Sequence, residues 1–174
     1  MSQNGNANLL GNWQNAGGGI YVRPDGELRV SFYINNSYKY AFTQLYLEAG
    51  IEYEIVAIAK NDRIAVYLNK TLIKEVEIEY EPISSEMPML IGANPQANDK
   101  HIDFANIEVS NIQIYNRAIN ENEVPIVSEG KVANNDGLLR YVDFTNKSYE
   151  NNEIIPEEAI ESYFVWIPKY RYQL

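Results

Sequence analysis

The feature that most constrains the fold is the alternation of apolar and polar residues in short segments. In residues 27–34 every second side chain is leucine, valine, phenylalanine or isoleucine. Residues 63–68 and 71–80 show a similar pattern on either side of Asn69-Lys70. Successive side chains of a strand point to opposite faces, so this period predicts strands with one buried face. Asparagine tolerates positive φ, so the two-residue break at Asn69-Lys70 predicts a tight hairpin.

Alternating segments recur along the chain, with loops rich in asparagine, glycine and proline between them. The 14 tyrosines and the many isoleucines and valines favour pleated, half-buried surfaces. No long helical period accompanies them. We therefore expect an all-β protein in which two antiparallel sheets pack face to face as a sandwich with little helix. Short helical turns are expected at residues 118–124 and 156–162.

Length and charge narrow the classes of partner. The 174 residues suit one domain of ordinary size. A net charge of −10 argues against nucleic acid and an anionic membrane as partners, because both attract a basic face. The chain has no cysteine, so disulfides and thiolate chemistry are excluded. Its apolar runs are too short to span a bilayer, and its first residues lack the pattern of a secretory signal.

Four segments, in this order, resemble the laminin-G-like members of the concanavalin A-like lectin/glucanase superfamily. They are VYLNK (66–70), LIGA (90–93), IQIYNRAI (112–119) and NENEV (120–124). The resemblance covers roughly residues 18 to 125. It implies a two-sheet antiparallel jelly-roll sandwich, and sugar binding as the usual function of the family.

Two departures from the family pattern shape the expected domain organisation. The family hairpin usually carries glycine where Lys70 stands. The segment GLLRYVDF (137–144) resembles the opening strand of the family, but here it follows the other segments. We expect residues 1–127 to form the main part of the sandwich. We expect residues 128–174 to form a C-terminal segment whose 137–144 strand completes it. The alternative is that this strand opens a second module.

Residues 163–174 indicate where the protein would act. YFVWIPKYRYQL (163–174) resembles a segment of phage and prophage tail-associated proteins of Gram-positive hosts, and we expect it to form an edge strand. The resemblance implies a virion protein, released outside the cell by lysis. Partners would then include other virion proteins and further copies of this chain.

A string of glutamates is the closest match to catalytic machinery. Retaining glycosidases need two carboxyl groups about 5 Å apart. The four candidates are Glu75, Glu77, Glu79 and Glu81. We expect the residues between them, Val76, Ile78 and Tyr80, on the core face, and the glutamates therefore on a solvated outer face. His101, the single histidine, is expected to be exposed in a loop. We therefore expect no enzyme and no catalytic residue.

Oxygen-rich loops raise the question of calcium, which takes six to eight oxygen ligands. The candidate ligands are either Asn61 and Asp62, or Asn94, Asn98, Asp99 and Asp103. Such loops are also ordinary turns, and the chain has no EF-hand spacing. We expect no metal and no cofactor, with calcium as the alternative.

Sugar binding requires an aromatic platform beside amide or carboxylate groups, because a sugar has an apolar face and a ring of hydroxyls. The candidates are Trp13, Tyr33, Asn35, Asn36, Tyr38 and Tyr40. The tyrosines would equally suit a sheet face without a ligand. We expect a non-catalytic recognition or adhesion module that binds glycans or another polymer of the bacterial surface. The alternatives are a structural module that decorates or oligomerises a phage particle, and a glycan hydrolase.

Overall fold

The computed structural model describes residues 5–60, 62–96 and 100–144. Of these residues, 47% lie in strands and 4% in a helix, which confirms an all-β fold with little helix. Every strand pair is antiparallel. No helix in the described part of the chain is long and apolar enough to cross a membrane.

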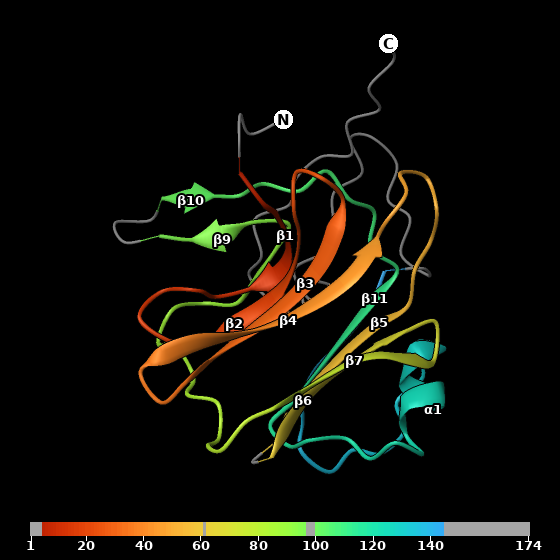
Figure 1. The fold of residues 1–174 in the computed structure, drawn as a ribbon. Coiled ribbons are helices and arrows are strands. Elements are labelled where there is room, and N and C mark those ends of the chain that lie inside the picture. The colour runs from red at the N-terminus through yellow and green to blue at the C-terminus, as the bar shows by residue number, and fades with distance from the viewer. Residues whose placement is uncertain (1–4, 61, 97–99, 145–174) are drawn as a thin grey trace, which may run out of the picture.

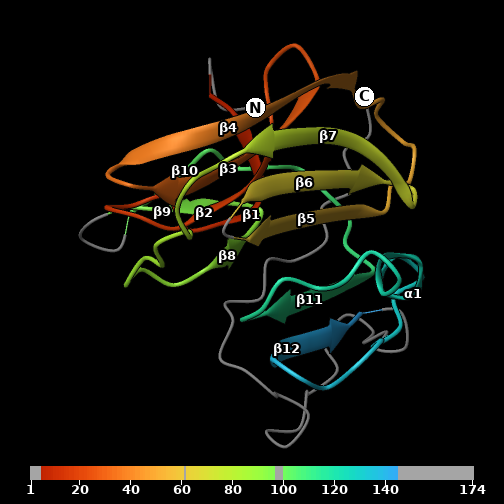
Figure 2. The same ribbon diagram turned by 60° about the horizontal axis from the view of Figure 1, so that its bottom comes forward.

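The strands of the described residues form two larger sheets and two short pairs (Figures 1 and 2). In chain order the strands are β1 (Ala7–Gly11), β2 (Gly18–Val22), β3 (Glu27–Ile34), β4 (Ser37–Tyr46), β5 (Ile55–Lys60), β6 (Arg63–Leu68), β7 (Thr71–Glu77), β8 (Leu90–Ile91), β9 (Asn94–Pro95), β10 (His101–Ile102), β11 (Asn111–Tyr115) and β12 (Leu138–Asp143). The larger sheets have the strand orders β4-β3-β2-β1-β8 and β5-β6-β7. β9 pairs with β10, and β11 pairs with β12.

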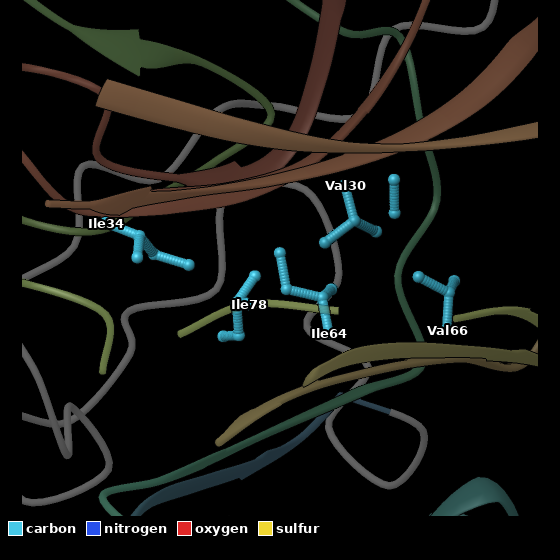
Figure 3. Close-up of a cluster of buried hydrophobic side chains, with 6 residues drawn as sticks. Val30, Ile34, Ile64, Val66 and Ile78 are labelled. Atoms are coloured by element: carbon cyan, nitrogen blue, oxygen red, sulfur yellow. The ribbon is translucent and has the colours of Figure 1, made fainter. Parts of the chain in front are cut away.

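The two larger sheets face each other and enclose the main core (Figure 1). Its buried members come from both layers, and five of them are labelled in Figure 3. They are Val30, Ile34 and Ala41 from the five-stranded sheet, with Ile64, Val66 and Ile78 from the other side. Fully burying a side chain of this size stabilises a fold by about 1.5–3 kcal/mol. The alternating residues of β3 therefore point into the core, as the sequence predicts.

β6 is covered on both faces. Ile64 and Val66 face the five-stranded sheet, whereas Ala65 and Tyr67 pack on the opposite side against Val124 of the helix α1 (Val124–Ser128). This explains why β6 is buried from its second residue onward. The three-stranded sheet is thus the middle layer between the larger sheet and α1.

Two tight turns begin with an asparagine. Asn69 and Lys70 have φ values of 48° and 68°, which confirms the predicted hairpin between β6 and β7. Asn35 and Asn36 have φ values of 46° and 60° and connect β3 to β4 in the same way. Two successive positive φ angles match the twist of antiparallel strands, which is why such turns favour asparagine.

The helical prediction for residues 118–124 is displaced by several residues. The helix lies at Val124–Ser128, with Pro125 in its first turn, where a missing backbone N–H is harmless. The helical prediction for residues 156–162 lies outside the described residues.

The strand predicted at residues 137–144 is confirmed as β12. It pairs with β11, and this pair lies beyond β5 in Figure 2. That β12 completes the sandwich stays a prediction, as does the division of the chain at residue 127. The predicted edge strand at 163–174 lies outside the described residues.

Candidate ligand-binding site

The outer face of the five-stranded sheet carries an aromatic row: Tyr33 on β3 and Tyr38, Tyr40 and Phe42 on β4. Cross-strand pairing places Tyr33 opposite Tyr38. Their ring centroids are 5.0 Å apart, those of Tyr38 and Tyr40 are 6.4 Å apart, and those of Tyr40 and Phe42 are 5.8 Å apart. Alternation along β3 sends Val30 to the core, so the row faces outward.

Small residues leave space beside this row. Ser31 is opposite Tyr40 on β4, and its partner on β2 is Gly19, which in turn is opposite Gly11 on β1. The positions of β2 and β1 directly across from Ser31 therefore carry no side chain. A Cβ atom added to Gly19 would collide with the carbonyl oxygen of Leu10, so the glycine also permits the close approach of β1 and β2.

An open hollow of about 190 Å³ occupies this region. Its lining combines four aromatic rings with three polar side chains and one carboxylate. The lining residues are Asn6, Trp13, Tyr21, Ser31, Tyr38, Tyr40, Asn94 and Asp103. They come from β2, β3, β4, β9 and three positions outside the strands, so the hollow exists only in the folded chain.

Hydrogen bonds position the part of the lining that lies outside the five-stranded sheet. The backbone N–H of Trp13 donates to Oδ1 of Asn94 at 3.2 Å, and the Asn94 side chain also bonds to the carboxylate of Asp103. The backbone N–H of Asn8 donates to the carbonyl of Asp103 at 2.9 Å, and its side-chain amide donates to the carbonyl of Ala93. These bonds fasten the β9–β10 hairpin beside β1, as Figure 1 shows.

The aromatic rings of the lining are also held in place, by a ring contact and a hydrogen bond. The Trp13 ring meets the Tyr21 ring at 88°, with centroids 4.9 Å apart. The Tyr38 hydroxyl donates to the carbonyl of Ala16 at 2.9 Å. Tyr21 is buried and Tyr38 is half-buried, and this burial raises the pKa of both hydroxyl groups. Their hydroxyl groups therefore stay neutral at ordinary pH.

The charge at the hollow comes from Asp103. Burial raises the pKa of this carboxyl, and the hydrogen bond from Asn94 acts in the opposite direction. The lining that the structure describes contains no lysine, arginine or histidine. Arg29 hydrogen-bonds to Tyr21, but its guanidinium is paired with Glu27 at 2.6 Å and lies 4.5 Å from the Phe42 ring centroid.

The hollow brings together three of the residues predicted from sequence, namely Trp13, Tyr38 and Tyr40. Tyr33 contacts Tyr38 within the aromatic row but does not line the hollow. Asn35 and Asn36 form the exposed β3–β4 turn and also do not line it. The amide and carboxylate groups of the hollow come instead from Asn6, Asn94 and Asp103.

From the sequence, Asn94 and Asp103 are candidates only as calcium ligands. No local pattern predicts the hydrogen bond between Asn94 and Trp13, because the two residues are 81 positions apart. Within the described residues, no group of three or more acidic, histidine or cysteine side chains could hold a metal ion. Asn61, Asn98 and Asp99 lie outside those residues.

The remaining candidates lie away from the hollow. Glu75, Glu77, Glu79 and Glu81 are exposed, as predicted. The core prediction is wrong for Tyr80, which is 53% exposed because it lies beyond the end of β7. Glu75 forms an ion pair of 3.2 Å with Arg63. His101 is exposed as predicted, although it lies in the two-residue strand β10 instead of a loop.

No protein-family model and no curated protein matches the chain. Solved structures that are similar include residues 221–444 of an S-layer domain-containing protein from Clostridium thermocellum ATCC 27405, with a TM-score of 0.41. The two chains are 13% identical, and the alignment covers 74% of this chain and 65% of that one. A similarity at this level carries no argument about fold or function.

Proposed function

We propose that the chain is a non-catalytic recognition module that binds glycans at the hollow and along the aromatic row. One observation carries the proposal: Trp13, Tyr38 and Tyr40 converge with amide groups and the carboxylate of Asp103. Rings can cover the apolar face of a sugar, while amides and a carboxylate bind its hydroxyls. Two facing antiparallel sheets and the sequence resemblance support a concanavalin A-like jelly-roll architecture.

The dimensions indicate how a glycan would bind. Pockets for drug-sized ligands measure about 300–1,000 Å³. The hollow, at about 190 Å³, is smaller and suits one sugar unit or one substituent. The aromatic row continues from Tyr40 to Phe42 on the open face, so it can support further units of a polymer.

We place the module on a virion, with a polymer of the bacterial surface and other virion proteins as partners. The support is the resemblance of residues 163–174 to phage tail-associated proteins. These residues lie outside the part of the chain that the structure describes.

A glycan array and a pull-down with bacterial cell walls test the proposal. We expect binding in the millimolar range for single glycans. Tyr40, which is 41% exposed, can be replaced without disturbing the core, and Tyr40→Ala should weaken binding about tenfold. Tyr46→Ala is the matched control, because Tyr46 is an exposed tyrosine of the same strand outside the hollow. Absence of binding at millimolar glycan would contradict the proposal.

A structural, oligomerising module is the second candidate, and the edge of the larger sheet favours it. Among the described strands, β4 pairs with β3 alone, and it carries the exposed side chains of Phe42 and Tyr46. An open edge of this kind can pair with another copy of the chain. A symmetric oligomer in light scattering, dissociated by Tyr46→Lys, would support this candidate. Hydrolysis of a β-glucan that Glu77→Gln abolishes would instead identify a glycan hydrolase.

A further inference from the structure

Four aromatic rings line the small space of the hollow. Trp13 and Tyr21 stand at 88° to each other, and Tyr38 and Tyr40 are neighbours on β4. The face of an aromatic ring is electrostatically negative and attracts cations, tryptophan most strongly. Several rings around one small volume therefore offer a favourable environment for a positive charge.

The charges around the rings favour a cation too. Asp103 supplies a carboxylate, and the described lining has no lysine, arginine or histidine to repel a positive group. The nearby Arg29 is neutralised by its ion pair of 2.6 Å with Glu27. The chain as a whole has a net charge of −10. Anionic sugars such as uronic acids are disfavoured for the same reason.

Hydrogen bonding distinguishes the kinds of cation. A primary ammonium has three N–H donors and loses affinity unless each finds an acceptor. Here Oδ1 of Asn94 already accepts from Trp13, and the Asp103 carboxylate already accepts a hydrogen bond from the Asn94 side chain. A quaternary ammonium has no N–H group to satisfy and presents only methyl groups to the rings.

We propose that the hollow binds a quaternary ammonium group, carried as a choline-type substituent on a surface glycan. This inference rests on the proposed function, because it names the part of the glycan that the hollow recognises. The volume of about 190 Å³ suits a single headgroup of this size, with the rest of the glycan lying along the aromatic row.

A titration with choline chloride at constant ionic strength tests the charge requirement. The full chain with Trp166→Phe leaves Trp13 as the one tryptophan, so its fluorescence reports on the hollow. The matched probe is 3,3-dimethyl-1-butanol, which has the shape of choline without the charge. We expect choline to bind at least about tenfold more tightly than this alcohol. Equal binding of the two would overturn the proposal.

Variants locate the binding. Asp103 has a φ of 53°, a value that asparagine also tolerates, so Asp103→Asn removes the charge while keeping the backbone. We expect Asp103→Asn and Tyr40→Leu each to weaken choline binding about fivefold or more, whereas Tyr40→Phe retains the ring and the affinity. Tyr46→Leu is the control and should bind as the parent does. A loss with Tyr46→Leu as large as with Tyr40→Leu would overturn the assignment, and thermal unfolding verifies that each variant is folded.

The carrier of the group is tested separately, and this arm distinguishes the two proposals. A phosphocholine-bearing glycan should bind more tightly than the same glycan without the substituent. Equal binding of both glycans overturns the ammonium proposal and leaves glycan recognition in place. Choline binding without any binding of either glycan overturns glycan recognition instead. A trimethyllysine peptide or phosphatidylcholine vesicles binding more tightly than the substituted glycan would overturn the assignment to a glycan.

Discussion

Arg117 and Glu123 form a two-bond ion pair just after β11. Nη1 of Arg117 lies 2.8 Å from Oε2 of Glu123, and Nη2 lies 2.7 Å from Oε1. Oε2 also accepts a hydrogen bond of 2.7 Å from the backbone N–H of Asn120. Nε of Arg117 donates to the carbonyl of Asp136 at 2.7 Å, so one side chain joins the turn before α1 to the loop before β12. Residues 112–124 (IQIYNRAINENEV) therefore have a structural role in this chain.

Acid should weaken the fold through this pair. The hydrogen bonds from Arg117 lower the pKa of Glu123 from 4.5 to about 2. Because the folded pKa is below the unfolded one, the stabilisation is complete above pH 4.5 and disappears as the pH falls through 2. We expect Glu123→Gln to reduce the free energy of unfolding at neutral pH by about 1–2 kcal/mol. Denaturant titrations along a pH series should show the difference from the parent shrinking below pH 4.5.

Glu79→Gln provides the control for this experiment. Glu79 is exposed and lies away from the pair, so its replacement should leave stability unchanged across the pH series. A Glu123→Gln difference that stays constant down to pH 2 would show that the ion pair is not the origin.

The core between the sheets should be sensitive at β6. Ile64 is fully buried, and Ile64→Ala removes methyl groups from the contact of the two layers. We expect a loss of about 2–5 kcal/mol in the free energy of unfolding, measured with urea. Leu72→Ala on the neighbouring β7 is the comparison, because Leu72 is 43% exposed and should cost less than about 1 kcal/mol. Similar losses for the two variants would be incompatible with a core in this position.

The β6–β7 turn offers a test of backbone strain. Lys70 has a φ of 68° and forms an ion pair of 2.9 Å with Glu129. Lys70→Ala and Lys70→Gly both remove the pair, so comparing them isolates the backbone. Glycine avoids the left-handed strain but gains entropy when unfolded, and we expect it to be more stable than alanine by about 0.5–1 kcal/mol. Thermal unfolding measures this, and a more stable alanine variant would show that the turn is not left-handed in solution.

The close approach of β1 and β2 predicts a larger effect at Gly19 than at another glycine. Gly19→Ala places a methyl group against the carbonyl oxygen of Leu10, whereas Gly50→Ala meets nothing and suffers only from its φ of 83°. We expect a destabilisation of about 1–3 kcal/mol for Gly19→Ala and less than about 1 kcal/mol for Gly50→Ala, measured by urea denaturation. The reverse order would contradict the pairing of Gly19 with Gly11.

Local patterns predicted the parts of the fold that local physics determines. Alternation along residues 27–34 identified the core side chains of β3, and Asn69-Lys70 identified a turn. β1 carries no such signal, because its pairing is irregular between Asn8 and Leu10. Asn8 is buried despite its amide, since that amide bonds to the carbonyl of Ala93, 85 positions away.

The hollow is predictable from the sequence only in part, for the same physical reason. Residue type alone makes aromatic side chains candidates for sugar binding, and this identifies Trp13, Tyr38 and Tyr40. Asn94 and Asp103 reach them only through the hairpin of β9 and β10, which contacts between distant parts of the chain hold in place. The amides of Asn35 and Asn36 suggest sugar binding, but these asparagines occur there because the turn requires positive φ.

The residues around Ser31 affect how selectivity at the hollow can change. Gly11 and Gly19 have no side chain to freeze, and serine has few rotamers, so occupation of the hollow loses little conformational entropy there. Differences in affinity between related ligands must then arise from the aromatic rings and from the polar groups of Asn6, Asn94 and Asp103. Replacing Tyr40 with other aromatic residues should therefore change ligand affinity without changing the structure of the underlying strands.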